Sequence, residues 1–390
     1  MNNPLEIARR PDIRAALSAF SENLESILDQ IVAIQQIPAP TFDEERRAIY
    51  IEEQFHACGL IDVSRDALNN VYGRSAGASP ADPPVILTAH LDTVFPIETD
   101  LTVRRDGAIL YGPGIGDNST GVAGLLQIAG ALREHNLVHA ADIYFVANVG
   151  EEGLGDLRGM RAVVDRFGGR ATYVIVEGGL YGKLIHQAVG VRRYHVTVTA
   201  PGGHSWGGFG ADSAIHVLGQ LIVDIDHLNV PTIPKTTYNV GIIRGGISIN
   251  SIANAAELWL DLRSEGSAEL GQLVRDVVEI VDSRNRQYAA EGRSVEIVME
   301  QVGDRPAGSI DRQSPVVACA ETALRLMGCE DVHYVASSTD ANIPLSRGYQ
   351  AVCLGLTVSG NSHRPDEFVD PTNLPAGLGQ LLLVTLAIAG

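Results

Sequence analysis

The N-terminal part of the chain carries apolar residues at helical spacing. Over residues 13–36 they recur every three or four positions, and the pattern stops at Pro38. We expect one helix over this segment, because such spacing places apolar side chains on one face and proline ends helices. The pattern resumes after Thr41 or Asp43, either of which could cap a second helix that runs through Phe55.

The pattern then changes to short, almost wholly apolar runs. They occupy residues 85–89, 143–149 and 173–176, and residues 121–133 between the first two have helical spacing. Apolar runs of this length are typical of strands that are covered on both faces. Because such strands alternate with helices, the pattern predicts an α/β domain with a largely parallel sheet.

From about residue 190 one face of the strands becomes polar. Residues 193–199 alternate between apolar and polar side chains, which predicts a strand with one solvated face. The later segments predict a helix at 212–228, strands at 239–245 and 257–262, a helix at 268–283 and a strand at 295–300. This β-α-β-β-α-β order is typical of a small α+β sandwich.

After Pro306 the buried α/β pattern returns. It predicts a helix at 315–327, a strand at 351–356 and a helix at 373–388. We therefore expect a discontinuous α/β domain, residues 1–188 and 307–390, with a mostly parallel central sheet flanked by helices. A smaller α+β sandwich, residues 189–306, interrupts it, and a chain of 390 residues is long enough for two domains.

Composition narrows the possible partners. The net charge is −18, with 47 acidic against 29 basic residues and no basic stripe, which argues against nucleic acid or an anionic membrane as partner. The N-terminus lacks the apolar run of a signal peptide, and no stretch approaches the roughly 20 apolar residues of a membrane span. The four cysteines, at 58, 319, 329 and 353, are scattered and are expected to be reduced thiols. We expect a cytoplasmic protein.

Polar residues that could bind metal or act in catalysis follow the apolar strands. In open α/β sheets, ligands bind at this edge. One strand is followed by His90 and Asp92, where Asp92 can fix the tautomer of the imidazole. Another is followed by Glu151 and Glu152, of which one can bind a metal while the other acts as a general base. The candidate metal ligands are two histidines and three carboxylates, a set that suits two zinc ions bridged by one carboxylate: His90, Asp117, Glu152, Glu177 and His363.

These residues carry a resemblance to a known family. In order and spacing, six motifs resemble the M20 metallopeptidases: His90-Leu91-Asp92, Gly116-Asp117-Asn118, Glu151-Glu152-Gly153, Glu177, Gly202-Gly203-His204 and Ser362-His363. That family includes glutamate carboxypeptidase, aminoacylase, succinyl-diaminopimelate desuccinylase and peptidase T. The resemblance covers essentially the whole chain, including the inserted domain.

The resemblance implies a role for each motif residue. Asp117 would bridge two zinc ions, with cobalt or manganese as possible substitutes. His90 and Glu177 would complete one metal site, and Glu152 and His363 would complete the other. Asp92 would orient His90, Glu151 would be the general base, and the peptide bond after Asp117 would be cis.

The resemblance also implies a lid and dimerisation role for the inserted domain. His204 would reach the active site of the partner subunit in a homodimer and support the oxyanion. Substrate would be contacted by Asn250, by Thr339-Asp340 and by an arginine that holds a carboxylate. Arg305 is the better candidate for that arginine and Arg263 the other.

The expected reaction is zinc-dependent hydrolysis of an amide or peptide bond in a small peptide or N-acyl amino acid. In the resembling family, glutamate at position 177 favours cleavage next to a free C-terminal carboxylate. The loop at 116–121 lacks the Met-Lys usual in carboxypeptidases, so a di- or tripeptide aminopeptidase remains an alternative. A catalytically inactive metal-binding relative is a second alternative, against which the presence of Glu151 argues. A hydrolase of carbamoyl or hydantoin-derived substrates would usually carry a different ligand pattern.

Overall fold

The computed structural model describes residues 1–390, which form two compact units. Unit 1 comprises Met1–Ala188 and Ser309–Gly390, and unit 2 comprises Val189–Gly308. The chain therefore leaves unit 1 once and returns to it once.

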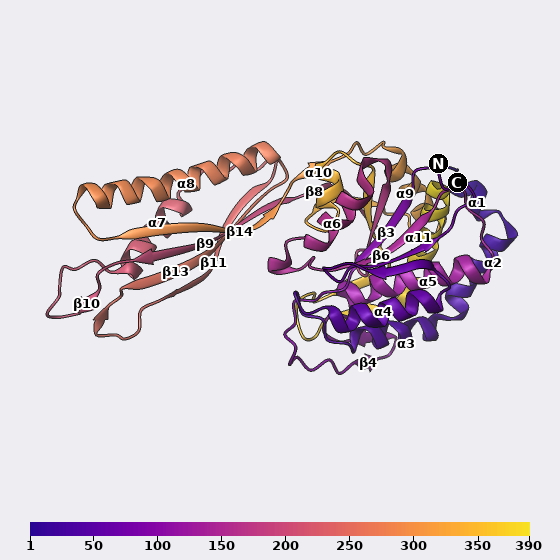
Figure 1. Ribbon diagram of the computed structural model, residues 1–390, viewed down its shortest axis with the longest axis horizontal. Helices are drawn as coiled ribbons and strands as arrows, with labels where there is room; N and C mark the ends of the chain where they lie inside the picture. The colour runs from indigo at the N-terminus through magenta and orange to yellow at the C-terminus, as the bar shows by residue number, and fades with distance from the viewer. The chain divides into compact units, whose positions relative to one another are not determined.

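Unit 1 is built on a nine-stranded sheet (Figure 1). The strand order is β1-β2-β6-β3-β7-β17-β8-β15, and β16 pairs with β8. The strands are β1 (Ile61–Arg65), β2 (Val71–Ser75), β3 (Val85–His90), β6 (Ile143–Asn148), β7 (Thr172–Glu177), β8 (Lys183–Ala188), β15 (Gly308–Ser309), β16 (His333–Ser337) and β17 (Ala351–Gly355). The central strands β6, β3, β7 and β17 are mutually parallel, which confirms the predicted α/β fold class.

Helices cover both faces of this sheet. They are α1 (Pro4–Ala8), α2 (Pro11–Glu22), α3 (Leu24–Gln35), α4 (Glu45–Ala57), α5 (Gly121–Glu134), α6 (Arg158–Phe167), α9 (Pro315–Leu326), α10 (Asn342–Ser346) and α11 (Leu374–Ala389). In β3, Val85 and Leu87 pack into the core that contains α5 and α11, whereas Ile86 packs into the core that contains α6 and α10. Burial on both faces explains why the strand sequence is continuously apolar.

Two sequence predictions in unit 1 are wrong. The single helix expected over residues 13–36 is two helices, because Asn23 leaves the helical backbone region between α2 and α3, and asparagine favours such breaks. The segment Pro371–Ala389 is long and apolar enough to cross a membrane, with a mean hydropathy of 1.4, contrary to the expectation of no such stretch. Since 72% of it is buried, it is a core helix here, and its apolar residues pack on all sides.

A second, small sheet belongs to unit 1. It has the order β18-β19-β5-β4, formed by β4 (Arg104–Asp106), β5 (Ile109–Tyr111), β18 (Val358–Gly360) and β19 (Phe368–Asp370). Pairing of β19 with β5 brings the segment after His363 beside the glycine-rich loop that holds Asp117. All four cysteines are free, as expected.

Unit 2 is a four-stranded antiparallel sheet with the order β11-β13-β9-β14. Its strands are β9 (Gly190–Thr199), β11 (Thr236–Gly245), β13 (Ala255–Ser264) and β14 (Glu296–Arg305), and the helices are α7 (Ala214–Asp226) and α8 (Ser267–Ala290). Figure 1 shows α7 and α8 beside this sheet. One face of the sheet packs against both helices through Val196 and Val198, and the alternate residues of β9 remain partly exposed. The predicted half-solvated α+β sandwich is confirmed.

Candidate metal centre

Parallel pairing brings the sequence motifs to one edge of the unit 1 sheet. His90 is the last residue of β3, Glu177 is the last residue of β7, and Glu151-Glu152 follow β6 closely. Asp117 comes from the irregular turn η1 (Ile115–Thr120) that precedes α5. Since β6, β3 and β7 are parallel neighbours, their carboxyl ends lie together at this edge.

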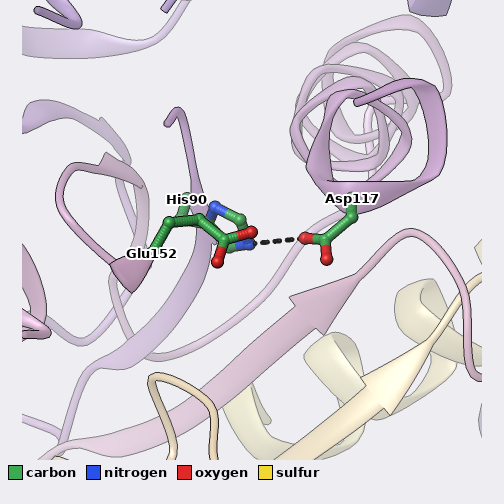
Figure 2. A group of neighbouring side chains, drawn as sticks. All are labelled: His90, Asp117 and Glu152. Atoms are coloured by element: carbon green, nitrogen blue, oxygen red, sulfur yellow. Dashed lines mark ion pairs between the residues drawn. The ribbon is translucent and has the colours of Figure 1, made fainter. Parts of the chain in front are cut away.

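Asp117 lies between two imidazoles. His90 Nε2 is 3.1 Å from Asp117 Oδ1, a pairing that Figure 2 shows, and His363 Nε2 is 3.3 Å from Asp117 Oδ2. The two oxygens of one carboxylate therefore face two different histidines. This is the arrangement that a carboxylate bridging two metal ions requires.

The other two carboxylates flank the histidines. Glu152 Oε1 lies 3.1 Å from His363 Nε2, and Glu177 Oε2 lies 3.8 Å from His90 Nε2. Donor atoms of His90, Asp117 and Glu152 all lie within 4.8 Å of one another. The structure thus brings all five sequence-predicted ligands together.

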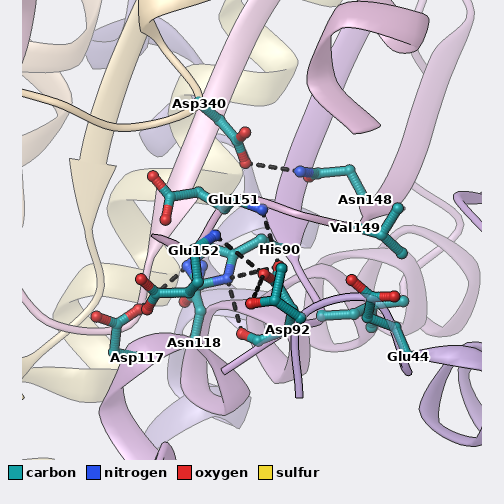
Figure 3. A network of polar contacts seen from close by, with 12 residues as sticks. Glu44, His90, Asp92, Asp117, Asn118, Asn148, Val149, Glu151, Glu152 and Asp340 are labelled. Carbon is teal, nitrogen blue, oxygen red and sulfur yellow. Dashed lines mark hydrogen bonds and ion pairs between the residues drawn. The ribbon is translucent and has the colours of Figure 1, made fainter. Parts of the chain in front are cut away.

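Asp92 connects this cluster to the loop after β6. Its Oδ1 accepts a hydrogen bond from the backbone N–H of Glu151, and its Oδ2 accepts one from that of Glu152, both at 2.9 Å (Figure 3). The hydroxyl of Thr41 also donates to Oδ2, and His90 Nδ1 lies 3.0 Å from the carbonyl oxygen of Asp92. One buried residue therefore orients a candidate ligand and the two consecutive glutamates.

Burial and neighbouring charges shift the pKa values of the cluster in opposite directions. Burial raises the pKa of Glu177 well above its ordinary value; His90 opposes this, while Asp117 and Glu151 add to it. Burial alone would raise the pKa of Asp117, but hydrogen bonds with His363 and His90 hold it below its usual range. Hydrogen bonds of His363 with Asp117 and with Glu152 raise the pKa of His363 to about 10.

The donor set fits divalent cations. Three carboxylates meet in a largely buried space, where like charges destabilise one another unless a cation is present. Two imidazoles and three carboxylates are ligands that zinc accepts. Residues His90, Asp117, Glu152, Glu177 and His363 can therefore hold metal with no further protein group.

Backbone geometry around Asp117 follows the family resemblance. The Asp117–Asn118 peptide bond is cis, as expected. The side chain of Asn118 accepts hydrogen bonds from the N–H groups of Gly121 and Gly178, and it donates to the carbonyl oxygen of Val176. Asn118 thus joins the turn to the end of β7, a role that sequence reasoning missed.

The sequence analysis also missed Glu367, Arg47 and the ion pair of Arg158 with Glu44. Each is an isolated charged residue in the sequence, and the sequence does not reveal that it is buried or paired. Glu367 is buried beside the Asp117 loop, and burial raises its pKa to about 7. Arg47 is buried behind His90 and Asp92. The guanidinium of Arg158 holds both oxygens of buried Glu44, at 2.7 and 2.8 Å.

The predicted substrate-binding residues and the predicted catalytic residue His204 are divided between the units. In unit 1, Asp340 Oδ2 accepts a hydrogen bond from Asn148 at the end of β6 (Figure 3). Thr339, the residue before it, is buried. Unit 2 carries four candidates: His204, Asn250, Arg263 and Arg305.

In unit 2 two of these candidates lie together. The short strands β10 (Gly203–His204) and β12 (Ser251–Ile252) pair, and the N–H of Ser205 donates to the carbonyl oxygen of Asn250. His204 is exposed and its Nδ1 accepts hydrogen bonds from the N–H groups of Trp206 and Gly207. Arg263 is exposed and pairs with Asp261 at 2.6 Å, whereas Arg305 is buried.

Known proteins share this fold and sequence pattern. A putative succinyl-diaminopimelate desuccinylase of Mycobacterium tuberculosis is 26% identical over 373 residues, 91% of this chain and 96% of the relative. The succinyl-diaminopimelate desuccinylase of Corynebacterium glutamicum is 27% identical over 291 residues, 68% of this chain and 74% of the relative. The crystal structure of a tripeptidase from Staphylococcus aureus superposes with a TM-score of 0.77 at 22% identity, covering 93% of this chain and 98% of the tripeptidase.

A family match also spans most of the chain. Peptidase family M20/M25/M40 matches residues 86–385, which contain the glycine-rich turn, the strand ends and all five clustered donors. This chain belongs to peptidase family M20/M25/M40 and is a hydrolase of that family.

Proposed function

We propose that this protein is a dinuclear zinc hydrolase that cleaves an amide or peptide bond next to a free C-terminal carboxylate. The substrate is a small peptide or an N-acyl amino acid. The observation that carries the proposal is the position of Asp117, whose two oxygens face His90 and His363 at 3.1 and 3.3 Å. Cobalt or manganese can replace zinc, because carboxylate-rich sites accept several divalent ions.

Each residue of the cluster has a defined task. His90 and Glu177 would hold one metal ion, Glu152 and His363 would hold the other, and Asp117 would contribute to both sites. Bound metal supplies Lewis-acid polarisation of the scissile carbonyl and acidifies the attacking water. Asp92 keeps the His90 ring in orientation through Nδ1, which leaves Nε2 directed at Asp117.

Glu151 is the general base. Its N–H is held by Asp92, and its carboxylate points to the same side as those of Glu152 and Asp117 in Figure 3. Glu151 removes a proton from the attacking water and later donates it to the leaving amine nitrogen as the C–N bond breaks. The presence of this glutamate supports a working enzyme over an inactive metal-binding relative.

The substrate class rests on Glu177, the arginines and the relatives. Two relatives are named as desuccinylases, so their names describe removal of an acyl group. Arg263 is exposed and pairs with Asp261, whereas Arg305 is buried at the end of β14. We propose Arg305 as the group that holds the substrate carboxylate, because a guanidinium can bind both carboxylate oxygens at once. Asn250, Thr339 and Asp340 complete the proposed substrate contacts.

We further propose a homodimer in which His204 acts in the partner's active site. Unit 2, the proposed lid and dimerisation domain, exposes six large apolar side chains around the paired loops and on edge strand β11: Trp206, Phe209, Ile242, Ile243, Ile247 and Ile249. Trp206 and Phe209 are about nine-tenths exposed, at 89% and 91%. Monomeric proteins rarely leave such a group uncovered, and a second copy would bury it. A cytoplasmic location is part of the same proposal.

A substrate panel tests the reaction. Zinc-loaded protein is incubated with N-succinyl and N-acetyl amino acids, C-terminally amidated peptides and free di- and tripeptides, with Glu151→Gln as control. We expect cleavage to need a free C-terminal carboxylate, to tolerate a blocked N-terminus and to fall about 10²–10⁴-fold in Glu151→Gln. A requirement for a free amino terminus would instead identify an aminopeptidase.

A further inference from the structure

Glu367 holds the loop that carries Asp117. The side chain is fully buried. Its Oε1 accepts hydrogen bonds from the N–H groups of Gly116 and Asp117, both at 2.8 Å, and its Oε2 accepts one from Gly114 at 3.2 Å. One carboxylate therefore satisfies three backbone donors within four residues of chain.

The main chain strengthens the same connection. The carbonyl oxygen of Glu367 accepts a hydrogen bond from the N–H of Gly112 at 2.8 Å, and the next residue, Phe368, pairs with Tyr111 in the small sheet. The loop from 112 to 117 is thus attached along its length to a single residue.

The loop packs too closely on its surroundings to accommodate a side chain at Gly116. A Cβ atom at Gly116 would lie 2.7 Å from the Cβ of Ser359 and 3.1 Å from Oε1 of Glu367. Only glycine allows this approach, so the backbone N–H groups can reach the buried carboxylate. A shift of the carboxylate would therefore be passed directly to the backbone of Asp117.

Glu367 also lies four residues after His363. One short segment between β18 and β19 consequently carries an imidazole that faces Asp117 Oδ2 and the carboxylate that fixes the backbone of Asp117. Glu367 therefore connects the segment that carries His363 to the loop that carries Asp117, although these parts of the metal centre are far apart in sequence.

We propose that Glu367 is a positioning residue that sets the direction of the Asp117 carboxylate, so that one oxygen faces His90 and the other faces His363. The inference rests on the proposed function, because the two oxygens need this direction only if they share a pair of metal ions. Glu367 itself contacts backbone donors and is not a ligand.

The test measures metal binding rather than activity alone. Apo-protein competes with a chromogenic chelator for Zn²⁺, and the visible absorption spectrum of the Co²⁺-loaded protein reports the coordination geometry. The variants are Glu367→Gln, which keeps the shape but replaces one acceptor oxygen with a donor, and Glu367→Ala, which removes all three bonds. Asp142→Asn is the matched control, because this buried carboxylate also accepts a backbone bond, from Gly77 at 2.9 Å, at the opposite end of β6.

We expect Zn²⁺ affinity to fall about 10–100-fold in Glu367→Gln and further in Glu367→Ala, with an altered Co²⁺ spectrum. Asp142→Asn should keep both the affinity and the spectrum of the wild type. Thermal unfolding followed by circular dichroism gives the temperature at which each variant begins to unfold. The metal titrations are made below that temperature.

Two other results have distinct meanings. If Glu367→Gln and Glu367→Ala melt earlier but keep the wild-type Zn²⁺ affinity and Co²⁺ spectrum, Glu367 supports only the fold and the inference is wrong. If the wild-type protein itself binds no Zn²⁺, the proposed function is wrong, and the inference that rests on it is wrong as well.

Discussion

The guanidinium of Arg47 donates a hydrogen bond to the carbonyl oxygen of Leu91 at 2.7 Å, inside the protein core. Leu91 separates His90 from Asp92, so this bond holds the backbone between a candidate ligand and the residue that orients it. Arg47 also donates two hydrogen bonds to the carbonyl oxygen of Ile37, at 2.9 and 2.6 Å. Burial lowers the pKa of Arg47 to about 10, and the negative charge of Asp92 opposes this change.

Arg47→Met should destabilise unit 1. Methionine fills a similar volume but leaves buried carbonyl oxygens without donors and removes the positive charge near Asp92, which together cost about 2–5 kcal/mol. We expect a lower urea midpoint in far-UV circular dichroism. Arg46→Met, an exposed change one residue earlier in the same helix, should leave the midpoint almost unaltered. Equal midpoints for the two variants would contradict a structural role for this arginine.

The central architecture could be predicted because burial leaves a direct trace in the sequence. Strands β3 and β7 are buried on both faces and therefore read as unbroken apolar runs. The edge strand β1, its neighbour β2 and the short strands of the small sheet were not predicted. In β1 every residue is exposed or partly exposed, so no apolar pattern marks it.

His90, Glu152 and Glu177 could be located for a similar reason, since they stand at or just after the ends of buried strands. Asp117 and His363 were also expected at buried strand ends, but Asp117 lies in the turn η1 and His363 between the short strands β18 and β19. Residues whose side chains hydrogen-bond to distant backbone groups could not be predicted in this way. Glu367 and Arg47 are single charged residues whose partners are carbonyl and N–H groups of remote segments, 250 residues away in the bond from Asp117 to Glu367. Their importance depends on contacts that only the folded chain defines.

The four thiols should differ in reactivity. Burial raises the pKa of the Cys319 thiol to about 12 and that of Cys353 well above its ordinary value. Because the thiolate is the reactive form, both buried thiols should react slowly at pH 8. Native protein should react with Ellman's reagent only through Cys58 and Cys329, which are partly exposed, and urea should release all four. Cys329→Ser should remove one of the native reactions, and fast reaction of all four in native protein would contradict the buried placement.

Removal of metal should destabilise unit 1 selectively. The clustered carboxylates repel one another without a cation, and an ion at 100 times its dissociation constant adds about 2.7 kcal/mol to folded-state stability. Both tryptophans, Trp206 and Trp259, lie in unit 2, whereas all five candidate ligands lie in unit 1. A chelator should therefore lower the melting temperature seen by circular dichroism more than that seen by tryptophan fluorescence. His363→Ala should reduce the effect of the chelator, and no effect on the wild type would argue against a resident metal.

Complementation between two inactive variants tests whether His204 acts in the partner subunit. His204→Ala and Glu151→Gln should each be inactive as homodimers. Mixed dimers, coexpressed with two different tags and purified through both, contain one site with Glu151 from one chain and His204 from the other. Because the two-fold dimer then has one complete site of two, we expect about half of the wild-type kcat.

The alternatives to this trans arrangement give other results. If His204 served its own subunit, neither site of the mixed dimer would be complete and no activity would return. His216→Ala is a suitable control for the histidine change, because His216 is exposed on α7 of the same unit. This variant should keep full activity as a homodimer. Sedimentation of Ile249→Asp, which places a charge on the exposed apolar group, should show a shift from dimer to monomer together with loss of activity, since each separated site would then lack His204.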